Sequence, residues 1–143
     1  MSKREPETLK IWIKKAENDL KTAIDELSTQ NPATDTVCFH AQQCAEKYLK
    51  AFLVANRREI KKTHLLEELI DGIAREIDPE FKKLMEETDI LVLSNYAVFA
   101  RYPPSDSLEE AFPSLEEARK AVESAKKLRE FIRKKLKELG FIP

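Results

Sequence analysis

Apolar side chains recur at intervals of three and four residues along five segments of this chain, which is the period of an α-helix. The first segment carries the pattern at Leu9, Ile13, Ala16, Leu20, Ile24 and Leu27. Only two glycines occur in the 143 residues, so little in the sequence interrupts long helices. The sequence therefore predicts an all-α fold, an up-and-down antiparallel four-helix bundle with one additional short helix.

The expected helices lie at about residues 6–27, 36–56, 64–77, 79–101 and 114–139. Four of the expected starts carry residues that cap or begin helices: Asp35, Thr63, Asp78 with Pro79, and Ser114 with Glu117. Pro103 and Pro104 are expected to end the fourth helix, and Gly140 the fifth. The length fits one domain over residues 1–143, with enough apolar side chains for a core.

Charged residues make up 36% of the chain, yet the formal net charge is only -1. This balance argues against a protein whose main task is to coat nucleic acid or anionic lipid. The abundance of Lys and Glu with little Gly is typical of a thermophilic source. The amino-terminal residues show no signal peptide, and no apolar run approaches the length of a membrane span. We therefore expect a soluble, cytoplasmic protein with no membrane partner.

The two cysteines, Cys38 and Cys44, lie in the same expected helix. Their six-residue separation places them about 9 Å apart along the axis, too far for a mutual disulfide. Both are expected to be buried, reduced thiols of a cytoplasmic protein. A zinc site would need these cysteines to converge with His40 and His64, and their spacing matches no zinc motif. We therefore expect neither a metal nor a cofactor.

The most basic stretch joins the second and third expected helices at residues 57–64. Thr63 and His64 fall where the free N–H groups of a helix start attract anions, so a phosphate could bind there. The alternative is a solvated loop in which Thr63 only caps the helix.

A second candidate site lies where the fourth expected helix ends. Arg101 and Tyr102, fixed by the prolines that follow, could bind a phosphate and stack on a base. The alternative is an ordinary helix stop. On the second helix Lys47 lies in a polar stripe with Gln43, Glu46 and Lys50, where it could neutralise a ligand. Glu46 and Lys50 also fit a plain intrahelical pair, and His40 fits a structural role beside the core.

Four blocks of sequence together resemble the HEPN domain (higher eukaryotes and prokaryotes nucleotide-binding). They are residues 16–20 (AENDL), 41–51 (AQQCAEKYLKA), 62–66 (KTHLL) and 101–103 (RYP), in the order found in that family. The resemblance implies a helical bundle similar to the substrate-binding domain of kanamycin nucleotidyltransferase. It also implies homodimerisation and pairing with a small, separately encoded nucleotidyltransferase, in many members as a toxin–antitoxin system.

Many HEPN members are metal-independent ribonucleases. Their motif is an arginine followed four to six residues later by a histidine, assembled across a dimer. Arg101 matches the arginine, but residues 105–107 are Ser105, Asp106 and Ser107. The histidines of the chain, His40 and His64, both lie far upstream. Because proton transfer in RNA cleavage at neutral pH normally needs such a group, this departure counts against nuclease activity.

Three functions follow from these observations. The first is a non-catalytic module that binds nucleotide or substrate and acts with a minimal nucleotidyltransferase. Its expected ligand-binding residues are Lys47, Thr63, His64, Arg101 and Tyr102. The second is a ribonuclease toxin that acts on RNA with Arg101 and a recruited histidine such as His64. The third is a structural homodimeric scaffold without a small ligand.

Overall fold

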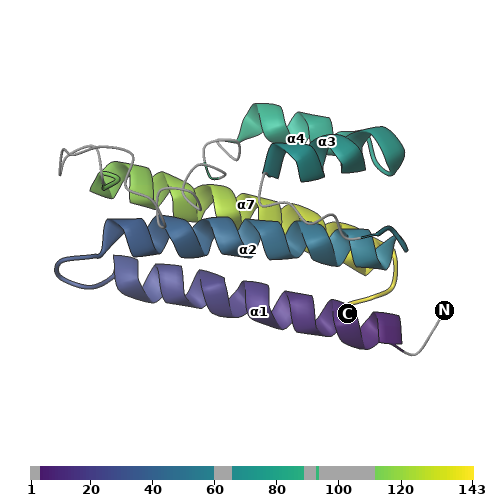
Figure 1. Cartoon of the computed structure of the whole chain (residues 1–143), viewed down its shortest axis with the longest axis horizontal. Helices are drawn as coiled ribbons and strands as arrows, with labels where there is room; N and C mark the ends of the chain where they lie inside the picture. Colours follow the sequence, from purple (N-terminus) through teal and green to yellow (C-terminus); the bar gives the residue numbers. More distant parts are fainter. Residues whose placement is uncertain (1–3, 60–65, 89–92, 94–111) are drawn as a thin grey trace.

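The computed structural model describes residues 4–59, 66–88, 93 and 112–143. Its helices are α1 (Arg4–Leu27), α2 (Thr34–Ala55), α3 (Leu66–Glu76), α4 (Glu80–Glu87) and α7 (Leu115–Glu138) (Figure 1). No strand occurs among the described residues. The prediction of an all-α fold is confirmed.

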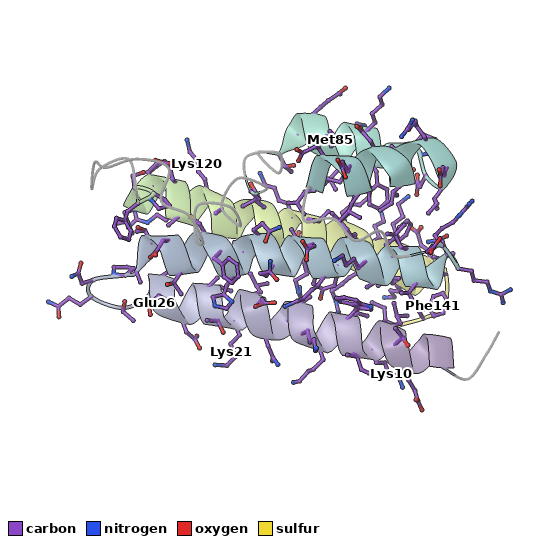
Figure 2. The ribbon with its side chains drawn as sticks, viewed as in Figure 1. Lys10, Lys21, Glu26, Met85, Lys120 and Phe141 are labelled. Atoms are coloured by element: carbon purple, nitrogen blue, oxygen red, sulfur yellow. The ribbon has the colours of Figure 1, made fainter. Side chains whose placement is uncertain are left out.

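The three long helices, α1, α2 and α7, form the body of the bundle. Figure 1 shows α1 antiparallel to α2, with α7 alongside α2 and the short pair α3 and α4 on the side away from α1. The outer side of α1 is polar, and Lys10 and Lys21 point away from the bundle (Figure 2). None of the described helices has both the length and the apolar character that a membrane span requires.

The core forms around α2, whose apolar face is buried as its period predicts. All seven residues expected on that face are buried: Val37, Ala41, Cys44, Ala45, Tyr48, Leu49 and Phe52. The corresponding stripe of α7 is buried from Ala118 to Leu136, whereas Leu139 is exposed. Burial of these side chains is the main source of stability for a fold of this kind.

The hairpin of α3 and α4 packs on the bundle through the buried apolar face of α3 and through one aromatic side chain of α4. Phe81 of α4 is fully buried, with its ring centroid 4.8 Å from that of Phe52 and 5.0 Å from that of Phe131. Lys135 of α7 adds an ion pair at 2.9 Å to Asp78 and another at 2.8 Å to Glu80. Apolar contact and paired charge therefore fix the same turn against α7.

The ends of α7 follow their sequence signals. Ser114 accepts from the Glu117 N–H at 3.0 Å, and the Glu117 carboxylate accepts from the Ser114 N–H, which completes the expected capping box. At the other end Gly140 has φ +86°, and the Phe141 N–H donates to the Leu136 carbonyl at 2.9 Å. This left-handed residue ends the helix, as predicted.

The start of α2 differs from the prediction. The helix begins at Thr34 after Ala33, so Asp35 lies in its first turn and is not the N-cap. The N-cap residue is Ala33, and its N–H donates to the Glu26 carboxylate of α1 at 3.0 Å. Asp35 still favours the helix, since an acidic side chain in the first turn interacts favourably with the positive end of the helix dipole.

The fourth helix is shorter than predicted. It ends at Glu87, because Thr88 is extended, with φ −135° and ψ 159°. The Thr88 hydroxyl donates to the Leu84 carbonyl at 2.8 Å, which satisfies one acceptor of the last turn. Two glutamates at this end also interact unfavourably with the negative end of the helix dipole. The predicted Thr63 cap and the predicted stop at Pro103 and Pro104 lie outside the described residues.

Candidate functional site

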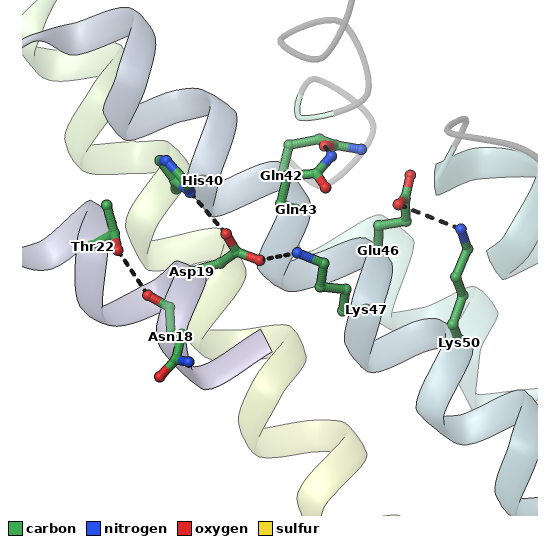
Figure 3. Close-up of polar contacts among 9 residues, drawn as sticks. All are labelled: Asn18, Asp19, Thr22, His40, Gln42, Gln43, Glu46, Lys47 and Lys50. Atoms are coloured by element: carbon green, nitrogen blue, oxygen red, sulfur yellow. Dashed lines mark hydrogen bonds and ion pairs between the residues drawn. The ribbon is translucent and has the colours of Figure 1, made fainter. Parts of the chain in front are cut away.

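A cluster of polar side chains joins α1 to α2 across their seam (Figure 3). Asp19 of α1 is its centre. One carboxylate oxygen, Oδ1, accepts from His40 Nδ1 at 2.8 Å, and the other, Oδ2, accepts from Lys47 Nζ. His40 and Lys47 are seven residues apart, which is about two turns, so both reach Asp19 from one face of α2.

Burial differs within this cluster. The Asp19 side chain is only 10% exposed, while those of His40 and Lys47 are 27% and 20% exposed. A carboxylate that leaves water must be compensated, and here two donors from the neighbouring helix provide that compensation. The contact also fixes His40 with its Nδ1 proton toward Asp19, as expected for a structural histidine.

A second polar feature runs along α2 on a buried face. Gln42, Glu46 and Lys50 follow one another at four-residue spacing, and all three are buried. Lys50 Nζ lies 3.4 Å from a Glu46 carboxylate oxygen and 5.6 Å from the centre of the Trp12 ring of α1. The predicted intrahelical pair is therefore present. Glu46 and Lys50, which the sequence places in a polar stripe beside the core face, are themselves buried.

A third cluster connects all three long helices. Arg129 of α7 binds both carboxylate oxygens of Glu17 of α1, with Nη2 2.7 Å from Oε1 and Nε 2.9 Å from Oε2. Arg133 donates to the Tyr48 hydroxyl at 3.4 Å. The hydrogen bonds from Arg129 hold the pKa of Glu17 below its usual range, and burial raises the pKa of Tyr48 to about 12. Every group here has a partner, which suits a structural role.

Both cysteines are free and buried, as predicted. Burial raises the pKa of the Cys44 thiol far above its usual range, so little thiolate forms near neutral pH. Among the residues that the structure describes, no group of three or more His, Cys, Asp or Glu side chains is placed to hold a metal ion.

A shallow groove of about 360 Å³ lies between the end of α4 and the first half of α7. Its charged lining consists of Glu86, Glu87, Glu116, Arg119, Lys120, Glu123 and Lys127. Four acids and three bases line it together, so the groove selects neither an anionic nor a cationic ligand by charge.

Of the residues expected to bind a ligand, the described part of the chain contains Lys47. Thr63, His64, Arg101 and Tyr102 lie outside the described residues, so their shared site stays a prediction. The sequence interpretation did not anticipate Asp19 as the partner of Lys47. One signal was present: Asp19 lies three residues after Ala16 and four before Ala23, where the helical period calls for an apolar residue.

Comparison with known proteins identifies the family. The family model of the HEPN domain matches residues 9–136, which include most of α1, all of α2, α3 and α4, and most of α7. No curated protein and no solved structure shows a significant match to the chain. Because the match covers most of the 143 residues and the described elements are helical, the chain belongs to the HEPN domain family.

Proposed function

We propose that this protein is a non-catalytic HEPN module that binds a nucleotide or a nucleotide-containing substrate. In this proposal it acts in the cytoplasm as a homodimer with a separately encoded minimal nucleotidyltransferase, in a toxin–antitoxin pair. The observation that carries the proposal is the missing histidine. Family membership brings a nucleotide-related role, while residues 105–107 after Arg101 contain no histidine to transfer a proton.

The position of His40 supports this reading. Only two histidines occur in the sequence. His40 uses Nδ1 to bind Asp19 across the α1–α2 seam, so its ring contributes to helix packing. A ribonuclease reading must therefore rely on His64, which precedes Arg101 by 37 positions and does not match the family motif.

In the proposed binding site, Lys47 and Arg101 contact phosphate, Tyr102 stacks on the base, and Thr63 with His64 donates hydrogen bonds. These residue types suit such a ligand. Cationic side chains bind phosphate oxygens, and an aromatic ring offers a stacking surface to any base.

Nucleotide binding is tested by thermal unfolding of the full chain with ATP and other nucleotides. A ligand at a hundredfold excess over its Kd stabilises the folded state by about 2.7 kcal/mol, which gives a clear rise in melting temperature. Lys47→Gln should remove the rise. Lys21→Gln is the matched control, because Lys21 also pairs with an aspartate, Asp25, but on the exposed face of α1. No rise with any nucleotide would favour the structural scaffold instead.

The partner is tested by affinity purification of the tagged chain from its native host, followed by mass spectrometry. Recovery of a small nucleotidyltransferase in stoichiometric amount supports the proposal, and its repeated absence contradicts the paired role.

The ribonuclease alternative is tested on purified protein with RNA. Cleavage that is lost in both Arg101→Ala and His64→Ala, and kept in Lys21→Gln on the exposed face of α1, would replace the non-catalytic proposal.

A further inference from the structure

The contact among Asp19, His40 and Lys47 has the form of an occupied oxyanion site. Two donors on α2, His40 Nδ1 and Lys47 Nζ, converge on the two oxygens of one carboxylate. A phosphate group presents pairs of anionic oxygens to donors in much the same way as a carboxylate does. The groups that would bind a phosphate are therefore already arranged around an anion, and that anion belongs to the protein.

Charge balance sets the condition under which Lys47 can bind a ligand. The single positive charge of Lys47 is matched by the single negative charge of Asp19, with which it is in direct contact. An incoming phosphate would meet no uncompensated positive charge, and it would be repelled by the carboxylate behind the ammonium group. Lys47 can therefore bind a phosphate only when the Asp19 carboxylate moves away from its ammonium group.

The surroundings of the cluster allow such an exchange. The two donors are more exposed than the carboxylate they hold, so solvent and small ions reach them first. Figure 3 shows Asn18, Thr22 and Gln43 around the cluster, all uncharged and polar. A phosphate would find hydrogen-bonding groups there, and the carboxylate of Glu46, which Figure 3 also draws, is paired with Lys50.

We propose that His40 and Lys47 form a phosphate-binding site on the α1–α2 seam and that Asp19 is its built-in competitor. The phosphate of a nucleotide must displace the Asp19 carboxylate, so the site stays closed to weakly bound anions. This inference rests on the proposed function, because it specifies how Lys47 takes the phosphate of that ligand.

The test is calorimetric titration of inorganic phosphate into the full-length protein and into Asp19→Asn. Asparagine keeps the size of the side chain and one accepting oxygen but removes the charge. Phosphate affinity should rise about tenfold or more, since one like charge in direct contact is removed. Adding Lys47→Gln to Asp19→Asn should abolish the gain. Asp25→Asn is the control, because it frees an exposed lysine, Lys21, outside the seam.

An unchanged phosphate affinity in Asp19→Asn would overturn the inference, as would an equal gain in Asp25→Asn. If Asp19→Asn fails to fold in chloride, phosphate should restore its helical circular dichroism, and failure to do so also overturns it. The two proposals can fail separately. If the wild-type protein binds nucleotide but Asp19→Asn gains no phosphate affinity, the proposed function stands and the competitor role of Asp19 is wrong. If Asp19→Asn gains phosphate affinity but the wild-type protein binds no nucleotide, the phosphate site stands and the proposed function is wrong.

Discussion

Arg129 of α7 binds both carboxylate oxygens of Glu17 of α1, although the two residues are 112 positions apart in the sequence. Bidentate, charge-assisted contacts of this kind are stronger than single ones, and lysine cannot reproduce their planar fork. Arg129→Lys should therefore lower the free energy of unfolding by about 1 kcal/mol, a modest value because both side chains are about a third exposed. Urea denaturation followed by circular dichroism measures it.

The control for this contact is Lys126→Arg, on the exposed face of the same helix, which should change stability by less than about 0.5 kcal/mol. A double-mutant cycle of Glu17→Gln with Arg129→Lys isolates the pair. A coupling energy near zero would show that the contact contributes nothing in solution.

The free energy of unfolding should decrease in acid, because folding lowers the pKa of two carboxylates, those of Glu17 and Asp78. Hydrogen bonds from Arg129 lower the pKa of Glu17. For Asp78, burial alone would raise the pKa, but hydrogen bonds from Lys135 and the Glu80 N–H lower it overall. Such groups stabilise the folded state above their ordinary values, 4.5 and 3.8, and lose that contribution as pH falls through the lower folded values. Melting temperature measured from neutral pH downward should fall across this range, and Arg129→Met should reduce the slope.

The helical period predicted the three long helices well because each lays one apolar stripe against the core. It failed at Thr88, where apolar residues continue at helical spacing while the backbone becomes extended. Periodicity reports which side chains could share a face, and an extended residue such as Thr88 leaves that sequence pattern intact. Only tertiary packing decides such an interruption.

The site was predictable in its residue types more than in its contacts. Lys47 was identified as a candidate, but its pairing with Asp19 depends on how α1 is rotated and shifted along α2. No local pattern contains that information. For the same reason the burial of Glu46 and Lys50 could not be predicted from the polar stripe to which they belong. The faces of α2 that remain open are set by the other helices.

Neither cysteine should react in the folded protein. Cys38 and Cys44 are fully buried, and burial raises the pKa of Cys44, whereas thiol reagents attack the exposed thiolate. Labelling with a chromogenic disulfide should give almost no signal under native conditions and two thiols per chain in denaturant. Ile11→Cys, at an exposed position of α1, supplies the reactive reference. Native labelling of either natural cysteine at the rate of that reference would refute the assignment.

Phe81 should dominate the attachment of α3 and α4. Phe81→Ala removes a fully buried ring between Phe52 and Phe131, a change that typically costs about 3–5 kcal/mol. Hydrogen exchange should then lose protection first in α3 and α4. Phe112→Ala, which truncates an exposed ring, is the matched control and should cost about 0.5 kcal/mol or less. Equal costs for the two substitutions would show that the ring contacts do not hold the hairpin.

Gly140→Ala should destabilise the end of α7 through the backbone alone. A methyl group at this position would meet no atom within 4 Å, but the φ of +86° disfavours any residue with a β-carbon. The expected cost is about 1 kcal/mol, measured by thermal denaturation, with Gly140→Asn less affected because asparagine tolerates this conformation better. An unchanged melting temperature in Gly140→Ala would mean that the last turn frays in solution.

The ion pairs between the long helices also determine how those helices are aligned along one another. A seam made only of small and aliphatic side chains tolerates a slip of one turn, about 5.4 Å, because similar surfaces still meet. In such a slipped bundle Asp19 would leave His40 and Lys47, and Glu17 would leave Arg129 in the same movement. The polar contacts thus favour the correct alignment over the slipped ones, even where they add little to the free energy of unfolding.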